Sequence, residues 1–167
     1  MVETSSMGPD ARDALYAEVA DHIARLIEGE TDEIAILATA ACELHHAFDY
    51  FDWTGFYRVV APGVLKVGPY QGGHGCLTIP FDRGVCGAAA RTKRTQLVPD
   101  VTKLAYHIAC SSTTRSEIVV PVLDECGEVR AVLDVDSDRL AAFDEADQIW
   151  LERIVETLAN AAGWKSK

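Results

Sequence analysis

The sequence lacks the features of membrane, secreted and nucleic-acid-binding proteins. No apolar run approaches the ~20 residues needed to span a bilayer. The polar first ten residues contain no apolar core of a secretion signal. Basic residues are few: 15 Lys and Arg stand against 26 Asp and Glu, for a formal net charge of −11 at pH 7. Because this charge repels phosphate backbones and anionic lipids, we expect the protein to bind neither nucleic acid nor membrane. The missing secretion signal predicts a cytoplasmic protein.

Two familiar motifs are also missing. No two cysteines have the CxxC spacing, which argues against a zinc ribbon or a thioredoxin-type site. The glycine-rich segment 68–75 is not followed by Gly-Lys-Ser/Thr, so it is not a phosphate-binding P-loop. The cysteines number five, which is odd, and without a secretion signal we expect them to be reduced thiols rather than a disulfide framework.

The length of 167 residues and the hydrophobic content of 49% are enough for one domain with a full core. We expect residues 1–8 to be a disordered tail and residues 9–167 to form a single domain. Apolar side chains recur at helical spacing over about 10–28 and 32–49, and Thr31 or Asp32 can cap the second helix.

The central part of the chain alternates strand and turn signals and is followed by one more helix. The predicted elements are strands over 53–60, 64–67, 77–80, 118–123 and 129–135, a short extended piece or turn over 98–101, a loop over 68–75 and a short helix over 84–94. Asp144, with Asp147 three residues later, caps the final helix. Pro121 indicates a sheet edge or a bulge. This order predicts an α+β fold with a central antiparallel sheet and the N- and C-terminal helices packed together on one side.

Segment 68–121 combines thiols, imidazoles and flexible backbone more densely than any other part of the chain. Its cysteines and histidines are His74, Cys76, Cys86, His107 and Cys110. Cys86 lies near the start of the predicted helix, where the positive end of the helix dipole favours thiolate. The five residues are zinc-capable, but their intervals match no common structural site, so we rank zinc below thiol redox chemistry. The remaining cysteines are interpreted as a core residue, Cys42, and an incidental turn thiol, Cys126.

Acidic residues gather at the end of the strand over 129–135. Asp134 and Asp136 share one face, roughly 7 Å apart by strand rise. If Glu117 joins them from the neighbouring strand, the three form an acidic cup that suits an ammonium group. Such crowding can raise the pKa of one carboxyl enough to keep it protonated and able to donate a proton. The alternative is a solvated strand end that caps the turn at Ser137.

Two aromatic residues, Trp53 and Tyr57, share a strand face with Gly55 between them. They can line a ligand pocket with glycine clearance between the rings. They can equally be ordinary core aromatics, and composition alone favours that interpretation.

The residues suit the reduction of a sulfoxide. A thiolate attacks the sulfur while an acid protonates the departing oxygen, and the resulting sulfenic acid condenses with a second thiol to a disulfide. By local context Cys110, near His107, is the best nucleophile. Cys86 and Cys76 are the candidates for the second thiol, and spacing alone does not show that the three meet.

The sequence closely resembles the free methionine-(R)-sulfoxide reductases, a catalytic branch of the GAF-domain superfamily. The matching segments cover roughly residues 30–160 and are Trp53-Thr-Gly-Phe-Tyr57, Gly68-Pro-Tyr-Gln-Gly72, Gly84-Val-Cys-Gly87, His107-Ile-Ala-Cys110, Ser116-Glu-Ile-Val-Val-Pro121 and Leu133-Asp-Val-Asp-Ser137. The resemblance implies a GAF-like domain. It departs from the family after Cys110, where an expected Asp is absent, and in the variable segment around His74.

The resemblance also implies an activity: reduction of free L-methionine (R)-sulfoxide as a defence against oxidative stress. It implies no bound cofactor or metal. Thioredoxin would be the reductant, itself reduced by NADPH through thioredoxin reductase, and the family analogy also allows a homodimer.

Roles for individual residues follow from the same resemblance. Cys110 would attack the substrate, with Cys86 as the alternative nucleophile, and Cys76 or Cys86 would resolve the sulfenic acid. Trp53 and Tyr57 would pack around the substrate methyl and side chain. The residues that would bind the ammonium and assist proton transfer are Glu117, Asp134 and Asp136. Two other readings remain: a non-catalytic GAF module that senses a small ligand such as a nucleotide, and a structural zinc protein.

Overall fold

The computed structural model describes residues 3–105 and 110–166. Its elements, in chain order, are the 3-10 helix η1 (Thr4–Ser6), α1 (Pro9–Leu26), α2 (Glu33–Ala47), β1 (Trp53–Ala61), β2 (Val64–Gln71), β3 (Thr78–Pro80), α3 (Gly84–Thr92), β4 (Gln96–Val98), the 3-10 helix η2 (Val101–Lys103), β5 (Ser116–Leu123), β6 (Val129–Ser137) and α4 (Glu145–Ala161). None of the described helices combines the length and apolarity that a membrane crossing requires.

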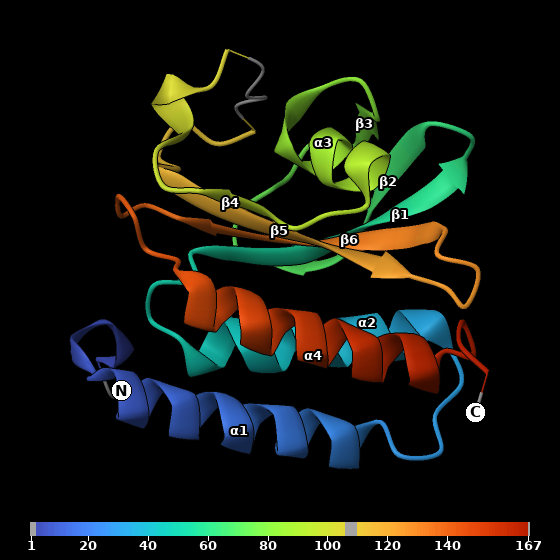
Figure 1. Cartoon of the computed structure of the whole chain (residues 1–167), viewed down its shortest axis with the longest axis horizontal. Helices are drawn as coiled ribbons and strands as arrows, with labels where there is room; N and C mark the ends of the chain where they lie inside the picture. Colours follow the sequence, from blue (N-terminus) through green and yellow to red (C-terminus); the bar gives the residue numbers. More distant parts are fainter. Residues whose placement is uncertain (1–2, 106–109, 167) are drawn as a thin grey trace.

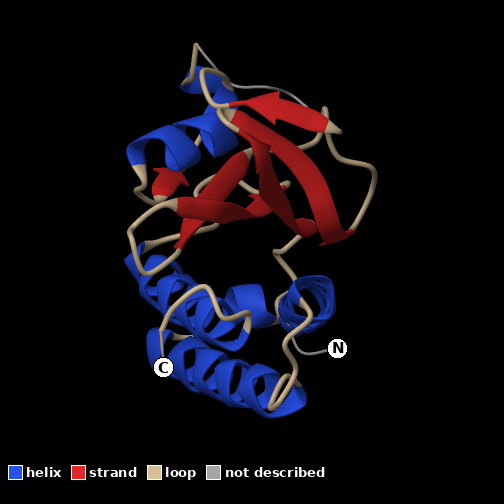
Figure 2. Ribbon diagram, turned by 90° about the vertical axis from the view of Figure 1, so that its right-hand side faces the viewer, coloured by secondary structure: helices blue, strands red, loops and turns tan. Residues whose placement is uncertain are grey.

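The strands form one antiparallel sheet in the order β3-β2-β1-β6-β5-β4. Helices α1, α2 and α4 lie on one face of this sheet, and α3 lies on the other (Figures 1 and 2). The predicted α+β class, with an antiparallel sheet and the terminal helices together on one side, is confirmed.

Successive side chains of each strand point to opposite faces of the sheet, so the hydrophobic core has two parts, one on each face. Leu133 and Val135 of β6 face the three long helices and belong to the larger core. Val132, on the opposite face, packs in a smaller core with Trp53, Tyr57 and residues of α3. Since side chains alternate in a strand, Asp134 lies on the same face as Val132, on the side of α3.

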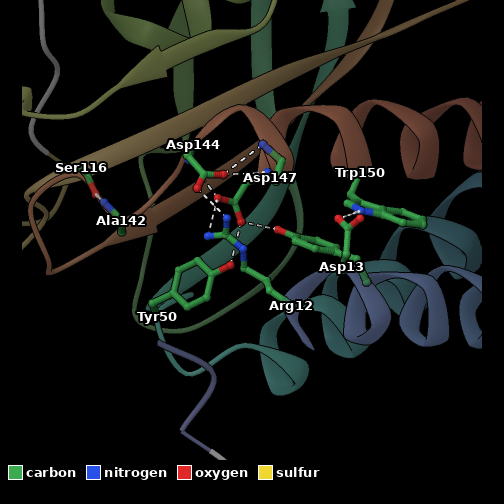
Figure 3. Close-up of polar contacts among 10 residues, drawn as sticks. Arg12, Asp13, Tyr50, Ser116, Ala142, Asp144, Asp147 and Trp150 are labelled. Carbon is green, nitrogen blue, oxygen red and sulfur yellow. Dashed lines mark hydrogen bonds and ion pairs between the residues drawn. The ribbon is translucent and has the colours of Figure 1, made fainter. Parts of the chain in front are cut away.

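Capping and a buried polar network fix the helices against the sheet (Figure 3). The side chain of Asp144 accepts a hydrogen bond from the backbone of Asp147, and the Asp147 side chain accepts one from the backbone of Asp144, which is the predicted capping box. Asp147 Oδ1 also accepts hydrogen bonds from the hydroxyls of Tyr16 (2.7 Å) and Tyr50 (2.6 Å). Arg12 pairs with both carboxylates. The network therefore joins α1, α4 and the segment that leads into β1.

Strand β2 is longer than predicted. Residues 68–71, expected to be loop, continue the strand, and Tyr70 pairs with Gly55 of β1. The register shifts between Gly55 and Tyr57, so the sheet absorbs Gly68 and Pro69 as an irregularity. The glycine and proline that suggested a loop thus mark a bulge.

Pro121 lies where β5 has lost one neighbour. Strand β4 pairs with Glu117, Ile118 and Val119, and Pro121 lies two residues further along β5. The position is therefore a local sheet edge, as the proline indicated.

Part of the expected N-terminal tail has defined contacts. Thr4 donates a hydrogen bond to the Asp49 carboxylate (2.5 Å) and accepts one from the Asp49 backbone (2.8 Å). Disorder across residues 1–8 as a whole stays a prediction.

Candidate active site

A cavity is lined by residues of β1, β5 and β6 together with residues of α3, the helix on the face opposite the three long helices. It brings together seven of the eight residues predicted for the site, namely Trp53, Tyr57, Cys86, Cys110, Glu117, Asp134 and Asp136. The eighth, Cys76, is bonded to Cys110. His107, the other residue of interest near Cys110, lies outside the described residues.

Strand register explains how the three acids meet. Glu117 of β5 is the direct partner of Asp136 of β6, and Asp134 is paired with Gly55 of β1. Glu117 and Asp134 are each only 5% exposed, so they do not form a solvated strand end. Burial, followed by the charges of the neighbouring carboxylates, raises the pKa of Glu117, Asp134 and Asp136 well above their ordinary values.

The Cys86 thiol lies against this acidic cup. Its Sγ donates a hydrogen bond to Asp134 Oδ2 at 3.3 Å. Asp134 Oδ1 is buried and has no hydrogen-bond partner among the described residues. Burial, and then the charges of Asp134 and Glu117, raises the pKa of the Cys86 thiol well above its ordinary value.

The helix dipole was expected to favour the thiolate form of Cys86, and the raised pKa of this thiol contradicts that expectation. Cys86 is in the first turn of α3, as expected, but it is 3% exposed and faces carboxylates. Desolvation and like charge outweigh the dipole, because the dipole contributes only the equivalent of about half a charge.

A disulfide joins Cys76 and Cys110, which are 34 residues apart, with a Cα–Cα distance of 5.4 Å. Both cysteines are partly buried. The expectation that all five cysteines are reduced is thus wrong for this pair, because the fold brings the two backbones within the range that a disulfide needs. The other three cysteines, all in the described part of the chain, are free thiols: Cys42, Cys86 and Cys126.

The aromatic wall is both core and cavity lining. Trp53 stacks on Tyr57 with ring centroids 5.7 Å apart and on Tyr70 at 5.3 Å. The Trp53 indole Nε1 donates to the carbonyl of Gly73 at 2.9 Å. The Tyr57 pKa is raised by burial and by the charge of Asp134, so its hydroxyl stays neutral. The two interpretations left open for Trp53 and Tyr57 therefore both apply.

Two residues of the site, Gly75 and Tyr70, were not predicted from the sequence. A Cβ atom on Gly75 would lie 2.9 Å from both Trp53 Cζ2 and the Tyr57 hydroxyl, so only glycine lets the loop before Cys76 lie this close to the rings. Tyr70 was missed because its segment was expected to be loop. Alternation in an extended β2 would have placed it beside Trp53.

The assembled groups have complementary chemistry. When reduced, the two thiols of the Cys76–Cys110 pair can give two electrons and form the disulfide, and the acids offer both a negative surface and protons to donate. The aromatic rings provide an apolar wall. Such a cavity can hold a small cation, give a proton to a leaving oxygen and couple that step to thiol oxidation.

This fold and this cavity define a GAF domain. The family model for the GAF domain matches residues 12–161, and the chain belongs to this family.

Within the family, the similar proteins include reductases. A relative from Saccharomyces cerevisiae named "Free methionine-R-sulfoxide reductase" is 38% identical over 146 residues, with 84% of this chain and 81% of the relative covered. A similar solved structure is the X-ray structure of free methionine-R-sulfoxide reductase from Neisseria meningitidis in complex with its substrate. The two sequences are 44% identical, the TM-score is 0.87, and the match covers 92% of this chain and 91% of that chain. A third relative, "GAF domain-containing protein A" from Dictyostelium discoideum, is 41% identical over 160 residues, which are 96% of this chain and 100% of the relative.

Proposed function

We propose that the protein reduces free L-methionine (R)-sulfoxide to L-methionine. One observation carries the proposal: the Cys76–Cys110 disulfide borders the cavity that contains the buried acids Glu117 and Asp134. The similarity to the yeast and Neisseria reductases supports the same activity.

In the proposed first step, the Cys110 sulfur attacks the sulfoxide sulfur. Proton transfer to the sulfoxide oxygen accompanies the attack, and the oxygen moves to Cys110, giving methionine and a cysteine sulfenic acid. Asp134 and Glu117 are suited to supply the proton, because burial and neighbouring charge raise their pKa values well above the ordinary carboxyl values and so favour the protonated form.

In the second step, the Cys76 thiol condenses with the Cys110 sulfenic acid, releasing water and forming the disulfide. The disulfide between these two residues supports Cys76 as the resolving cysteine. Cys86 is a poor nucleophile, since its buried thiol has a raised pKa. Its hydrogen bond to Asp134 supports a role in holding that carboxyl in place.

Substrate binding would use the rest of the cavity. The acidic cup of Glu117, Asp134 and Asp136 would bind the α-ammonium, while Trp53 and Tyr57 would pack against the methyl and side chain. A peptide-bound methionine sulfoxide has an uncharged amide at this position. A charge-assisted contact of this kind contributes ~1.5–3 kcal/mol, so the cup would favour the free amino acid by one to two orders of magnitude.

A reductant must return the disulfide to two thiols. We assign this step to thioredoxin, recycled by NADPH and thioredoxin reductase, in the cytoplasm. No bound cofactor is needed for this cycle, because the cysteines carry the electrons. Residues 9–167 would act as one catalytic domain, and a homodimer is compatible with this proposal.

Turnover with separated epimers tests the function. Purified protein with thioredoxin, thioredoxin reductase and NADPH should oxidise NADPH when free methionine (R)-sulfoxide is added. The (S) epimer and a peptide containing methionine sulfoxide should give little or no oxidation. Cys126→Ser is the matched control, since this exposed thiol is outside the cavity, and it should keep full activity. Absence of turnover with both epimers of the free amino acid would refute the proposal.

A further inference from the structure

Three potential metal ligands converge on the sheet side of the cavity. The Cys86 sulfur and one carboxylate oxygen each from Glu117 and Asp134 all lie within 4.8 Å of one another, and all three residues are buried. The Cys86 sulfur and Asp134 Oδ2 are 3.3 Å apart. Zinc bonds of ~2.3 Å to sulfur and ~2.0–2.2 Å to oxygen, at a tetrahedral angle, place two such ligands about 3.6 Å apart.

We propose that Cys86, Glu117 and Asp134 form a binding site for a thiophilic divalent cation, Zn²⁺ or Cd²⁺, and that the bound cation inhibits the enzyme. Nothing in the reaction requires this ion. The set also differs from the histidine and cysteine combination considered from the sequence, because it contains one thiol and two carboxyls.

A second observation points to a cation at this place. Asp134 Oδ1 is buried, and no described residue donates a hydrogen bond to it. A buried acceptor without a donor loses the free energy of its hydration, and a cation restores that interaction. The oxygen therefore marks a position where positive charge is stabilised.

Charge balance supports the same conclusion. The three ligand atoms lie within 4.8 Å of one another, so a divalent cation among them would neutralise two of the three negative charges that the bound thiolate and carboxylates carry. On binding, the S–H bond of Cys86 breaks and a metal–sulfur bond forms. The thiol proton and the proton held by the carboxyls leave to solvent through the cavity.

The ligand types select the metal. A thiolate is a soft ligand that favours Zn²⁺ and Cd²⁺, whereas Ca²⁺ needs 6–8 oxygen ligands and Mg²⁺ prefers an octahedron of oxygens. Three protein ligands would leave a fourth tetrahedral position for water, and all three of these residues line the cavity.

The inhibitory part rests on the proposed function. A cation bound here occupies the same carboxylates that would hold the substrate ammonium and supply its proton. Zn²⁺ and free methionine should therefore compete. The existence of the site does not depend on any activity, so the two parts can be tested separately.

The binding test uses the oxidised protein with Cys42→Ser and Cys126→Ser. With the Cys76–Cys110 disulfide intact, Cys86 is then the single thiol of the chain. Titration with Cd²⁺ should produce the ultraviolet thiolate-to-cadmium absorption band, saturating at one ion per chain. Adding Cys86→Ser should abolish the band and weaken Cd²⁺ binding, measured by calorimetry, by more than about tenfold.

The carboxyl variants complete the test. Asp134→Asn should keep the band but weaken Cd²⁺ binding by ~10–100-fold. Asp138→Asn is the matched control, since this exposed residue lies on the same segment outside the three ligands, and it should leave the affinity unchanged. Circular dichroism of each variant checks the fold. A missing band in the Cys86-only protein, a band that survives Cys86→Ser, or an unchanged affinity in Asp134→Asn would overturn the site.

Competition separates inhibition from binding. Free methionine should weaken Cd²⁺ binding to the Cys86-only protein, and Zn²⁺ should raise the apparent KM in the turnover assay. If Cd²⁺ binds through Cys86 but methionine has no effect on it, the inhibitory mechanism is refuted while the cation site stands.

Discussion

The molecule contains two buried aspartates in opposite circumstances, Asp147 beneath the sheet and Asp134 above it. Asp147 is fully buried, yet it accepts hydrogen bonds from two tyrosine hydroxyls and a backbone N–H and lies beside Arg12 (Figure 3). Asp134 is also buried, but among the described residues its one hydrogen-bond donor is the Cys86 thiol, and it lies beside further acids.

The pKa of each aspartate reflects this difference. Burial raises the Asp147 pKa, but the hydrogen bonds of Tyr50 and Tyr16 and the charge of Arg12 offset part of the increase. For Asp134, burial and the neighbouring Glu117 act in the same direction, and only the Cys86 hydrogen bond opposes them. Asp147 is thus a fully hydrogen-bonded structural residue, or anchor, whereas Asp134 is a buried carboxyl that favours its protonated form and is available to a ligand.

The largest expected loss of turnover comes from a substitution on the cavity side of the sheet, and a matched substitution on the side of the long helices should have no effect. Cys110→Ser removes the proposed nucleophile and should lower turnover by at least about three orders of magnitude, because covalent catalysis is lost altogether. Cys42→Ser, in α2 on the other side of the sheet, should retain activity. Steady-state assays with the free (R) epimer measure both. A Cys110→Ser enzyme with near-normal turnover would transfer the nucleophile role to Cys86.

The anchor itself is tested by Asp147→Asn. The amide cannot accept from the Asp144 backbone and pair with Arg12 as the carboxylate does, so buried donors lose their acceptor. We expect the free energy of unfolding to fall by about 2–4 kcal/mol, measured by urea denaturation. Turnover per folded molecule should stay close to normal. Unchanged stability would mean that the network does not hold the helices.

Replacing aspartate by asparagine at position 134 should lower turnover and leave stability intact, the opposite of the result expected at position 147. Asp134→Asn removes a buried carboxyl whose ionisation is opposed by burial and by the neighbouring Glu117, so the free energy of unfolding should stay equal or rise. Turnover should fall by roughly 10²-fold, since a general acid contributes about 10²–10⁴. Denaturation and steady-state kinetics on the Asp147→Asn and Asp134→Asn proteins together give a direct test. If both variants behave alike, the distinction between anchor and reactive group is wrong.

Much of this contrast could be predicted from the sequence, because it depends on local alternation. A period of two placed Asp134 and Asp136 on one strand face. Whether Glu117 joins them was left open, and the register of β5 against β6 pairs it with Asp136. The capping role of Asp144 likewise followed from the spacing of two acids.

The features that could not be predicted from the sequence depend on contacts between segments far apart in the chain. The Cys76–Cys110 bond joins segments 34 residues apart, and no local pattern specifies that distance. The position of Cys86 in the helix favoured a thiolate, while burial and then the charge of Asp134, 48 residues later in the chain, raise its pKa. The tyrosine donors of Asp147 come from two further segments, so its second role as an anchor was not visible in the capping motif.

Stability as a function of pH gives a further test of the acidic cup. The pKa of Asp134 is raised in the folded protein, so the folded state binds more protons than the unfolded state above pH ~4. The contribution of this group to stability is therefore full below pH ~4 and is lost as pH rises towards the folded pKa. Asp134→Asn should reduce this decline by up to about 1.4 kcal/mol per pH unit. Urea midpoints from pH 4 to 8 measure it, and identical slopes in both proteins would count against a protonated cup.

The smallest effect concerns the loop that carries Cys76 over the aromatic wall. In Gly75→Ala the new methyl group would lie 2.9 Å from Trp53 Cζ2 and from the Tyr57 hydroxyl, both held in a packed core. The loop must move away by a few tenths of an ångström, which shifts Cys76 relative to Cys110 and should slow disulfide formation by up to about tenfold.

Gly73→Ala is the matched control in the same loop, because no described atom lies within 4 Å of a Cβ built at that position. Rapid-quench labelling of free thiols after a single turnover follows disulfide formation in both variants. If the methyl group displaces the loop, disulfide formation should be slower in Gly75→Ala than in Gly73→Ala, while the free energies of unfolding of the two variants remain similar. Equal rates would show that the loop adapts freely and that the aromatic wall does not set the position of Cys76.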